Sequence, residues 1–374
     1  MTVTAPYRYD IVGSFLRPEY LRKTRAAYEA GRASAEELRE TEDKAIRELV
    51  AKEKEIGLHV ITDGEFRRLT WHLDFMWGCD GIRRVKSETG NTTFNGEAAA
   101  IDDVTLEGRV SIHNHPFIEH FRFMKQFEDE ETVAKLTIPA PGQLYAQFTG
   151  RQELANTLKY YPDTAAFADD VVEAYAEFIR EFYAAGGRIL QLDDCTWGGF
   201  VNPETAKQLT GLEGSALDEY MELLVSIDNR VIATKPADLV INTHACRGNY
   251  HSTYFSSGAY DSVADPLFGE EHVDAYYLEY DDARSGGFEP LAKVSGDKKV
   301  VLGLITTKRP ELEDENAVIA RIREAEKYIP LGRLYLSPQC GFASCEIGNK
   351  LTEEQQWAKV KLVKDIAEKV WKDC

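Results

Sequence analysis

The chain has 374 residues, 43% of them hydrophobic, and a formal net charge of −19 at pH 7. This length is enough to bury a large core in one or two domains. The negative charge argues against nucleic acid and anionic membrane surfaces as partners. No apolar run approaches the length that spans a bilayer, and the first residues lack the apolar segment of a signal peptide. We therefore expect a cytoplasmic protein.

Six cysteines are scattered along the chain, at positions 79, 195, 246, 340, 345 and 374. This scatter in a long chain without a signal peptide does not indicate a disulfide framework. We expect free thiols, of which a subset binds metal. Cys79 and Cys195 are expected to be buried bystanders.

Short apolar runs alternate with amphipathic helical patterns along most of the chain. The runs expected to form strands are 9–14, 58–65, 134–141, 188–194, 238–244, 276–279, 299–305 and 334–340. Helices are expected from about residue 18 and over 34–56, 164–185, 217–234, 317–328 and 353–370. Ser34, with Glu37 three residues later, fits a capping box at the start of the second helix.

The pattern weakens between residues 80 and 130, where the segments around the turn at 90–93 alternate as in an inserted hairpin. Three histidines in this region, at positions 113, 115 and 120, are expected to face solvent. Arg83, Arg84 and Lys86 form either a solvated charge run or a site for the anionic tail of a folate.

Eight strands, nearly all separated by helices, predict an α/β protein with a closed (β/α)₈ TIM barrel. The alternative is a doubly wound open sheet, which usually has a glycine-rich phosphate loop after its first strand. The residues 12–15 do not form such a loop. Because no linker and no internal repeat divides the chain, we expect one domain over 1–374, with the hairpin inserted after the second strand.

A metal site is indicated by His244 and Cys246, which stand two residues apart at the end of an apolar run. On a strand these two side chains point to the same side, and imidazole with thiolate is a zinc-type pair. Two later strands also end in metal ligands, Glu279 and Cys340. Three strands therefore deliver a ligand at the carboxyl end.

In a barrel these strand ends converge on one mouth. The residues placed there are Ser14, Glu65, Asp193, Asp194, His244, Cys246, Glu279 and Cys340. Two thiols, one imidazole and one carboxylate suit a tetrahedral Zn²⁺, and ligands drawn from separate strands favour a reactive site over a structural one. Two thiolate ligands suit the activation of a substrate thiol; water activation for hydrolysis is the rival use.

These residues lie in short motifs that resemble the catalytic, C-terminal barrel of cobalamin-independent methionine synthase. That family belongs to the superfamily that includes uroporphyrinogen decarboxylase. The motifs occur in family order over nearly the whole chain, and they are Val12-Gly13-Ser14-Phe15, Asp63-Gly64-Glu65, Gln191-Leu192-Asp193-Asp194, His244-Ala245-Cys246, Leu278-Glu279-Tyr280 and Gln339-Cys340-Gly341.

The resemblance implies a zinc-dependent methyltransferase that methylates the thiol of homocysteine to give methionine. It implies that His244, Cys246, Glu279 and Cys340 bind zinc, and that Ser14, Glu65 and Asp193 hold the amino acid part of homocysteine. That assignment fits their chemistry, since two carboxylates suit an ammonium group and a Gly-Ser turn offers donors to a carboxylate.

Three departures from the family pattern leave the methyl donor open. The full synthase carries a second, N-terminal barrel, for which this chain has no room, so short single-barrel relatives are the better match. The family histidine that donates a proton falls on Thr306, and the residues that hold folate are not evident. The donor is methyl-tetrahydrofolate, methylcobalamin or an S-methyl compound.

Other readings of the same residues stay open. In place of binding substrate, Glu65 would form an ion pair with Arg67 or Arg68. Asp193 and Asp194 would in that case be a pair that orients His244. The protein is alternatively another zinc-thiol alkyltransferase, such as an epoxyalkyl–coenzyme M transferase, or a non-catalytic zinc or thiol sensor. The oligomeric state is not determined by the sequence, and a homo-oligomer is left open.

Overall fold

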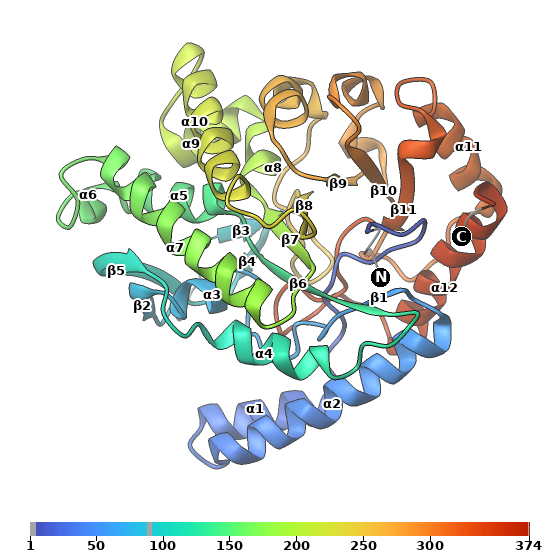
Figure 1. Cartoon of the computed structure of the whole chain (residues 1–374), viewed down its shortest axis with the longest axis horizontal. Helices are drawn as coiled ribbons and strands as arrows, with labels where there is room; N and C mark the ends of the chain where they lie inside the picture. The colour runs from blue at the N-terminus through green and yellow to red at the C-terminus, as the bar shows by residue number, and fades with distance from the viewer. Residues whose placement is uncertain (1–4, 88–91, 373) are drawn as a thin grey trace.

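A curled sheet of seven parallel strands forms the centre of the computed structural model, which describes residues 5–87, 92–372 and 374 (Figure 1). The strands lie in the order β1 (Val60–Ile61), β6 (Val133–Pro139), β7 (Ile189–Asp194), β8 (Val240–Ala245), β9 (Ala275–Glu279), β10 (Lys299–Ile305) and β11 (Leu334–Pro338). The predicted α/β class with a parallel sheet is confirmed, but among the described residues the sheet has seven regular strands and not the eight of the predicted closed barrel.

The expected first strand, 9–14, is not a regular strand. It forms an isolated bridge from Tyr9 to β11, and the expected second strand is reduced to two residues. Side chains of neighbouring elements bond to the carbonyl groups of the segment 9–14. Lys135 donates to the carbonyl of Ile11, the Gln191 side chain to that of Val12 at 2.9 Å, and the Thr62 hydroxyl to that of Gly13 at 2.7 Å. The segment thereby crosses between β11 and β1 with few backbone bonds.

Helices cover the outer side of the sheet (Figure 1). The long ones are α1 (Glu19–Glu29), α2 (Ala35–Ile56), α7 (Thr164–Ala184), α10 (Ser215–Ile232), α11 (Glu315–Ala325) and α12 (Glu353–Val370). Shorter ones are α3 (Leu73–Trp77), α5 (Pro141–Thr149), α6 (Leu154–Thr157), α8 (Thr196–Phe200) and α9 (Pro203–Thr210). The predicted helices are confirmed to within about three residues at each end. No helix in the described part of the chain has the length and apolar character needed to cross a membrane.

The region 80–130 contains two antiparallel pairs and one helix. β2 (Asp80–Val85) pairs with β5 (Asp103–Ser111), β3 (Thr92–Phe94) pairs with β4 (Glu97–Ala99), and α4 (Pro116–Lys125) follows. The β3–β4 hairpin packs on the loop after β8, where the ring centroid of Phe94 lies 5.3 Å from that of Tyr250. This hairpin therefore lies over the carboxyl end of the sheet.

Two of the three histidines of this region do not face solvent, which corrects the expectation that all of them do: His115 is buried, and His120 is half-buried with a buried Nδ1 atom. His115 accepts a hydrogen bond from the backbone N–H of Phe117 at the start of α4, and its other ring nitrogen lies 2.9 Å from the carbonyl of Phe75. Burial lowers the pKa of His115 to about 4, so it is neutral. His113 is exposed and pairs with Asp80.

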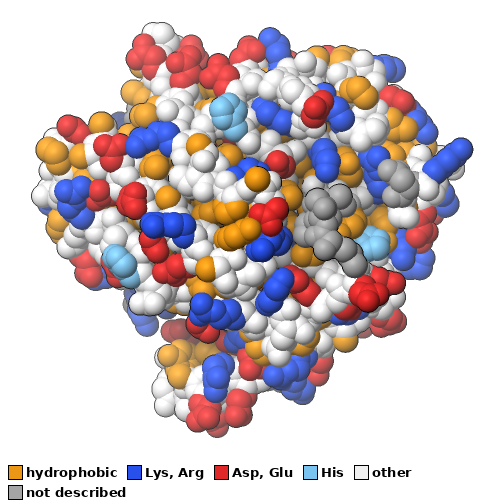
Figure 2. Space-filling view, in the orientation of Figure 1, with side chains coloured by type: hydrophobic (Ala, Val, Ile, Leu, Met, Phe, Trp, Pro, Cys, Tyr) orange, Lys and Arg blue, Asp and Glu red, His pale blue; other side chains and the backbone are white. Residues whose placement is uncertain are grey.

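The inner side of the sheet changes from apolar to polar toward the carboxyl ends of the strands. An apolar cluster of Ala5, Val60, Val133 and Ile189 fills the amino end. Above it, Lys135 forms a fully buried ion pair with Asp10, with 3.1 Å between Nζ and Oδ1. On the face of the molecule that Figure 2 shows, acidic and basic side chains are interspersed.

Replacing Ser34 by alanine should lower the free energy of unfolding by about 1 kcal/mol. The Ser34 hydroxyl accepts from the Glu37 backbone N–H at 3.1 Å, and the Glu37 carboxylate accepts from the Ser34 N–H at 2.7 Å. Thr41→Ala on the same helix is the matched control and should change stability by less than about 0.5 kcal/mol. Urea unfolding followed by circular dichroism measures both, and equal stabilities would mean that the cap contributes nothing.

Candidate metal centre and substrate pocket

The four predicted metal ligands meet at the carboxyl ends of β8, β9 and β11. One ligand atom from each of His244, Cys246, Glu279 and Cys340 lies within 4.8 Å of all the others, and all four residues are buried. His244 and Cys246 share one side of β8 because side chains alternate along a strand. The sequence therefore identified a cluster that can hold a metal ion.

The distances within this cluster match those of a tetrahedral zinc site. The sulfurs of Cys246 and Cys340 are 3.7 Å apart, and the Cys246 sulfur lies 3.5 Å from Oε1 of Glu279. Ligands at ordinary zinc distances and tetrahedral angles are about 3.8 Å apart for two sulfurs and about 3.6 Å for sulfur and oxygen. His244 Nδ1 lies 3.2 Å from the carbonyl of Tyr277, and its buried Nε2 has no hydrogen-bond partner among the described residues. That nitrogen is available to a metal.

The charges around the cluster prepare the carboxylate, but not the thiols, for metal binding. Burial raises the pKa of Glu279, but nearby cations, Lys308 first and then Arg284, lower it overall. Arg284 lies 3.5 Å from Oε2 of this carboxylate. The pKa of Cys246 and of Cys340 is raised, by contacts with neighbouring thiols and by burial. A bound cation is therefore needed to hold both as thiolates.

Glu65 and Asp193 line the same pocket as the cluster. Oε1 of Glu65 accepts from the Thr137 hydroxyl at 2.9 Å and lies 3.5 Å from Arg68, whereas Oε2 is buried without a partner among the described residues. Burial raises the pKa of Glu65, and burial and the neighbouring Glu65 raise that of Asp193 to about 8. Two buried carboxylates that lack a full set of donors suit a cationic ligand.

The backbone at Glu65 is strained, with φ at 60°. A residue other than glycine rarely adopts this left-handed conformation, and such strain clusters at functional sites. Three contacts hold the strained turn, because Arg17 donates to the Glu65 carbonyl at 2.8 Å and the Asp63 carboxylate accepts from the Glu65 N–H at 2.8 Å, while the Thr137 hydroxyl holds the side chain.

Ser14 lies in the pocket against the Gln-Cys-Gly motif that directly follows β11. Its hydroxyl accepts from the Ala343 N–H at 3.3 Å. A Cβ atom on Gly341 would lie 1.9 Å from this hydroxyl oxygen, so only glycine allows the approach.

The alternative roles considered for the carboxylates are met in part. Glu65 pairs with Arg68 through Oε1, at 3.5 Å, and leaves Oε2 without a partner among the described residues, whereas Arg67 pairs with Glu42 and Asp43. The Nδ1 atom of His244 bonds to a backbone carbonyl, and Oδ1 of Asp194 accepts from the N–H of Thr196 at 2.8 Å.

Several residues that line the pocket were missed by sequence reasoning. Trp71, His72, Phe94 and Ile101 supply its aromatic and apolar wall. The Trp71 and His72 rings stack with centroids 4.3 Å apart, and burial lowers the pKa of His72 to about 3. No periodicity in the region 80–130 points to Phe94 or Ile101, because only a three-dimensional contact brings the hairpin over the mouth.

Cys195 corrects the expectation of a buried bystander. It is partly exposed, lines the pocket and interacts with the thiol of Cys246. Two residues after Thr306 lies Lys308, which is buried. The ammonium group of Lys308 donates to the side chain of Asn249 at 2.8 Å. Asn249 itself lines the pocket.

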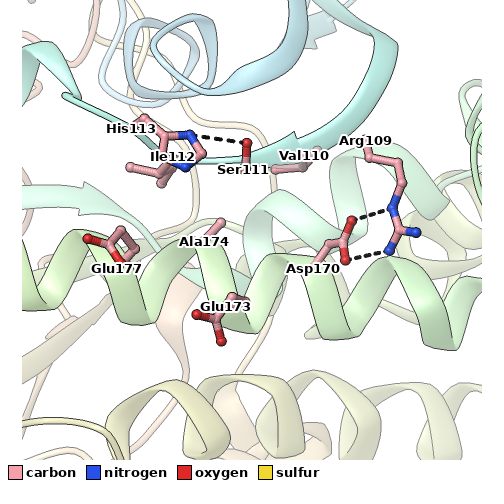
Figure 3. A pocket seen from close by; sticks show the side chains of 9 residues that line it. All are labelled: Arg109, Val110, Ser111, Ile112, His113, Asp170, Glu173, Ala174 and Glu177. Atoms are coloured by element: carbon pink, nitrogen blue, oxygen red, sulfur yellow. Dashed lines mark hydrogen bonds and ion pairs between the residues drawn. The ribbon is translucent and has the colours of Figure 1, made fainter.

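A second cavity, of about 300 Å³, lies between β5 and α7 (Figure 3). Arg109 forms a bidentate pair with Asp170, at 2.8 and 2.7 Å, and His113 contacts Ser111. Because these charges satisfy one another on an open surface, the cavity lacks the unpartnered ligands that distinguish the pocket at the strand ends.

Comparisons with known proteins identify related chains. A family model described as "Cobalamin-independent synthase, Catalytic domain" matches residues 157–369. The uncharacterised protein YxjG of Bacillus subtilis (strain 168) is 44% identical over 368 residues, which cover 98% of this chain and 95% of that protein. A methionine synthase of Pyrococcus abyssi (strain GE5 / Orsay) is 22% identical over 335 residues, 89% of this chain and 85% of its own.

Solved structures give the same fold. A protein from Listeria monocytogenes, provisionally assigned as a vitamin-B12-independent methionine synthase, is 36% identical with a TM-score of 0.75 and 99% coverage of both chains. A B12-independent methionine synthase from Shewanella sp. W3-18-1, solved with selenomethionine, is 20% identical with a TM-score of 0.71 and 98% coverage of both chains.

The purified protein should contain about one metal ion per chain. Cys246→Ser and Cys340→Ser should each lose most of it while the circular dichroism spectrum stays native, because the ligands lie at the strand ends. Cys374→Ser, at the exposed end of the chain, is the matched control and should keep the metal. Elemental analysis measures the content; full occupancy in both ligand variants would remove the assignment.

Proposed function

The chain belongs to the cobalamin-independent methionine synthase family, and on this premise we propose that it methylates the sulfur of homocysteine to give methionine. One observation carries the proposal: a thiol-rich metal cluster and two buried carboxylates line a single pocket. The cluster suits the thiol end of homocysteine, and the carboxylates suit its ammonium group.

His244, Cys246, Glu279 and Cys340 would hold zinc. Bound zinc supplies the positive charge that keeps a substrate thiol in its thiolate form at neutral pH. The residues around the cluster fix its geometry: the Tyr277 carbonyl orients the His244 ring, and Gln339 donates to Oε1 of Glu279 at 3.4 Å.

The amino acid end of homocysteine would lie against Ser14, Glu65 and Asp193. The unpartnered Oε2 of Glu65 and the carboxylate of Asp193 accept from the ammonium group, and the turn at Ser14 offers donors to the substrate carboxylate. The bound selenomethionine of the Shewanella relative, an analogue of the expected product, supports a site for this class of amino acid.

In the reaction the homocysteine sulfur attacks the methyl carbon of the donor. A sulfur–carbon bond forms, and the bond from the methyl group to the donor breaks with its electron pair staying on the donor. The wall of Trp71, Phe94 and Ile101 would face the donor and limit the access of water to the reacting atoms. The donor is methyl-tetrahydrofolate, methylcobalamin or an S-methyl compound.

Incubation of the zinc-loaded protein with homocysteine and each of these three donors should yield methionine from at least one of them. Detection of methionine by mass spectrometry is the measurement, and Cys340→Ser protein is the control that should give none. Coenzyme M with the same donors and with an epoxide should react poorly. If coenzyme M is alkylated faster than homocysteine, the protein is an alkyltransferase and the proposed function is wrong. If the zinc-loaded protein binds thiols and converts none of them, it is a non-catalytic sensor.

Asp193→Asn should weaken homocysteine binding by about 1.5–3 kcal/mol, or roughly ten- to a hundredfold, because a charge-assisted hydrogen bond to the ammonium group is lost. The variant should keep its zinc. 4-Mercaptobutanoate, which has the same thiol and carboxylate without the ammonium group, is the matched ligand and should bind native and variant protein alike. Calorimetric titration measures all four affinities, and an equal loss for both thiols would contradict the assignment.

A further inference from the structure

The interior of the sheet contains a chain of buried polar side chains that the proposed reaction does not itself require. It begins at Lys135 on β6, whose ammonium lies 3.1 Å from Oδ1 of Asp10 and 3.0 Å from Oε1 of Gln191, and also donates to the carbonyl of Ile11. These three acceptors match the three donors of an ammonium group. Lys135 is therefore fully satisfied although neither it nor Asp10 has any exposed side-chain surface.

Gln191 continues the chain on the neighbouring strand β7. It stands two residues before Asp193, so both side chains point to the inside of the sheet. Its Nε2 donates to Oδ1 of Asp193 at 2.7 Å and to the carbonyl of Val12 at 2.9 Å.

Lys135 determines which way the Gln191 amide points. An ammonium group only donates, so the amide oxygen must face it and the NH₂ group must face away. With the amide reversed, its NH₂ group would face an ammonium, and its oxygen would face a carboxylate and a carbonyl. All three contacts would then be repulsive. Lys135 thus ensures that Asp193 meets a donor and not a second acceptor.

The same two side chains also hold the segment that leads to Ser14. Lys135 binds the carbonyl of Ile11 and Gln191 binds that of Val12. The segment has only an isolated bridge to β11, so these side-chain bonds replace the missing strand ladder. One buried unit therefore links the carboxylate at Asp193 to the Gly-Ser turn.

We propose that Lys135 and Gln191 are positioning residues. They hold the Asp193 carboxylate in place for the ammonium group of an amino acid substrate, and the Ser14 turn in place for its carboxylate. The inference rests on the proposed function, since homocysteine is the ligand in question. Gln191 acts on Asp193 directly, whereas Lys135 acts on Asp193 through the orientation of Gln191 and on the Ser14 segment through the carbonyl of Ile11.

The test compares native protein, Gln191→Met, Lys135→Met and the double variant in calorimetric titrations with homocysteine and with 4-mercaptobutanoate. Gln191→Met should weaken homocysteine about tenfold, the scale of a lost hydrogen bond to a charged group, and 4-mercaptobutanoate by clearly less. Metal content and kcat should change little, so that the effect falls on KM. Ser337→Ala, another buried side chain of the inner face, is the control and should bind both thiols as the native protein does.

The double variant tests whether Lys135 acts on Asp193 through Gln191. Because Lys135 acts on Asp193 through Gln191, adding Lys135→Met to Gln191→Met should weaken homocysteine binding by clearly less than the two single losses combined. Because Lys135→Met leaves Asp10 buried and unpaired, Asp10→Asn/Lys135→Met is the companion variant if the single one does not fold.

The outcomes separate this inference from the proposed function. A native protein that binds no homocysteine overturns the proposed function. A native protein that binds it, with Gln191→Met binding equally well, overturns the positioning role. Equal losses for both thiols, or fully additive losses in the double variant, also overturn it, because a general effect on the fold would produce them.

Discussion

The parallel register of the sheet decides which side chains meet at the pocket. Asp193 is the register partner of His244, and His244 is the partner of Tyr277, so the candidate metal ligands and the carboxylate of Asp193 come from neighbouring strands. β10 offers no ligand and instead carries Gly303 next to Glu279 in register. A Cβ there would lie 2.7 Å from Cα of Gln339 and 2.8 Å from the carbonyl of Leu278. Glycine at this position lets the two ligand-bearing strands approach β10 closely.

A polar interior has a structural cost that is visible in the first segment of the chain. The buried Lys135 and Gln191 donate to the carbonyl groups of residues 11 and 12, in a segment that forms an isolated bridge and no regular strand. The segment before Ser14 is therefore held by two buried donors, the ammonium group of Lys135 and the amide group of Gln191. A regular ladder would have bonded the backbone equally well, but it would not have tied that backbone to Asp193.

The features that the sequence predicted are those with a local signature. His244 and Cys246 are two residues apart on an apolar strand, and Ser34 with Glu37 has the spacing of a capping box, so both were found from local pattern. The roles proposed for Ser14 and Glu65 rest on the family resemblance as well. Features that depend on long-range contact were missed: the β3–β4 hairpin meets the mouth through Phe94 and Tyr250, 156 positions apart in the chain, and no local pattern encodes that contact. The first strand was predicted wrongly for a related reason: its local pattern is that of a strand, whereas its carbonyl groups bond to side chains of β6 and β7, which are distant in the sequence.

The carboxylates of the pocket lie in two different electrostatic environments, one around Glu279 and one around Glu65 and Asp193. Glu279 has Arg284 and Lys308 near it, and its pKa is lowered despite complete burial. Glu65 and Asp193 have fewer compensating donors, and the pKa of each is raised. Keeping both as carboxylates in a buried site is costly until a cation enters between them. An ammonium group relieves that cost, whereas a thiol that carries only an anionic group adds to it. Under the proposed function, the same two carboxylates that destabilise the empty pocket therefore give it preference for an amino acid thiol.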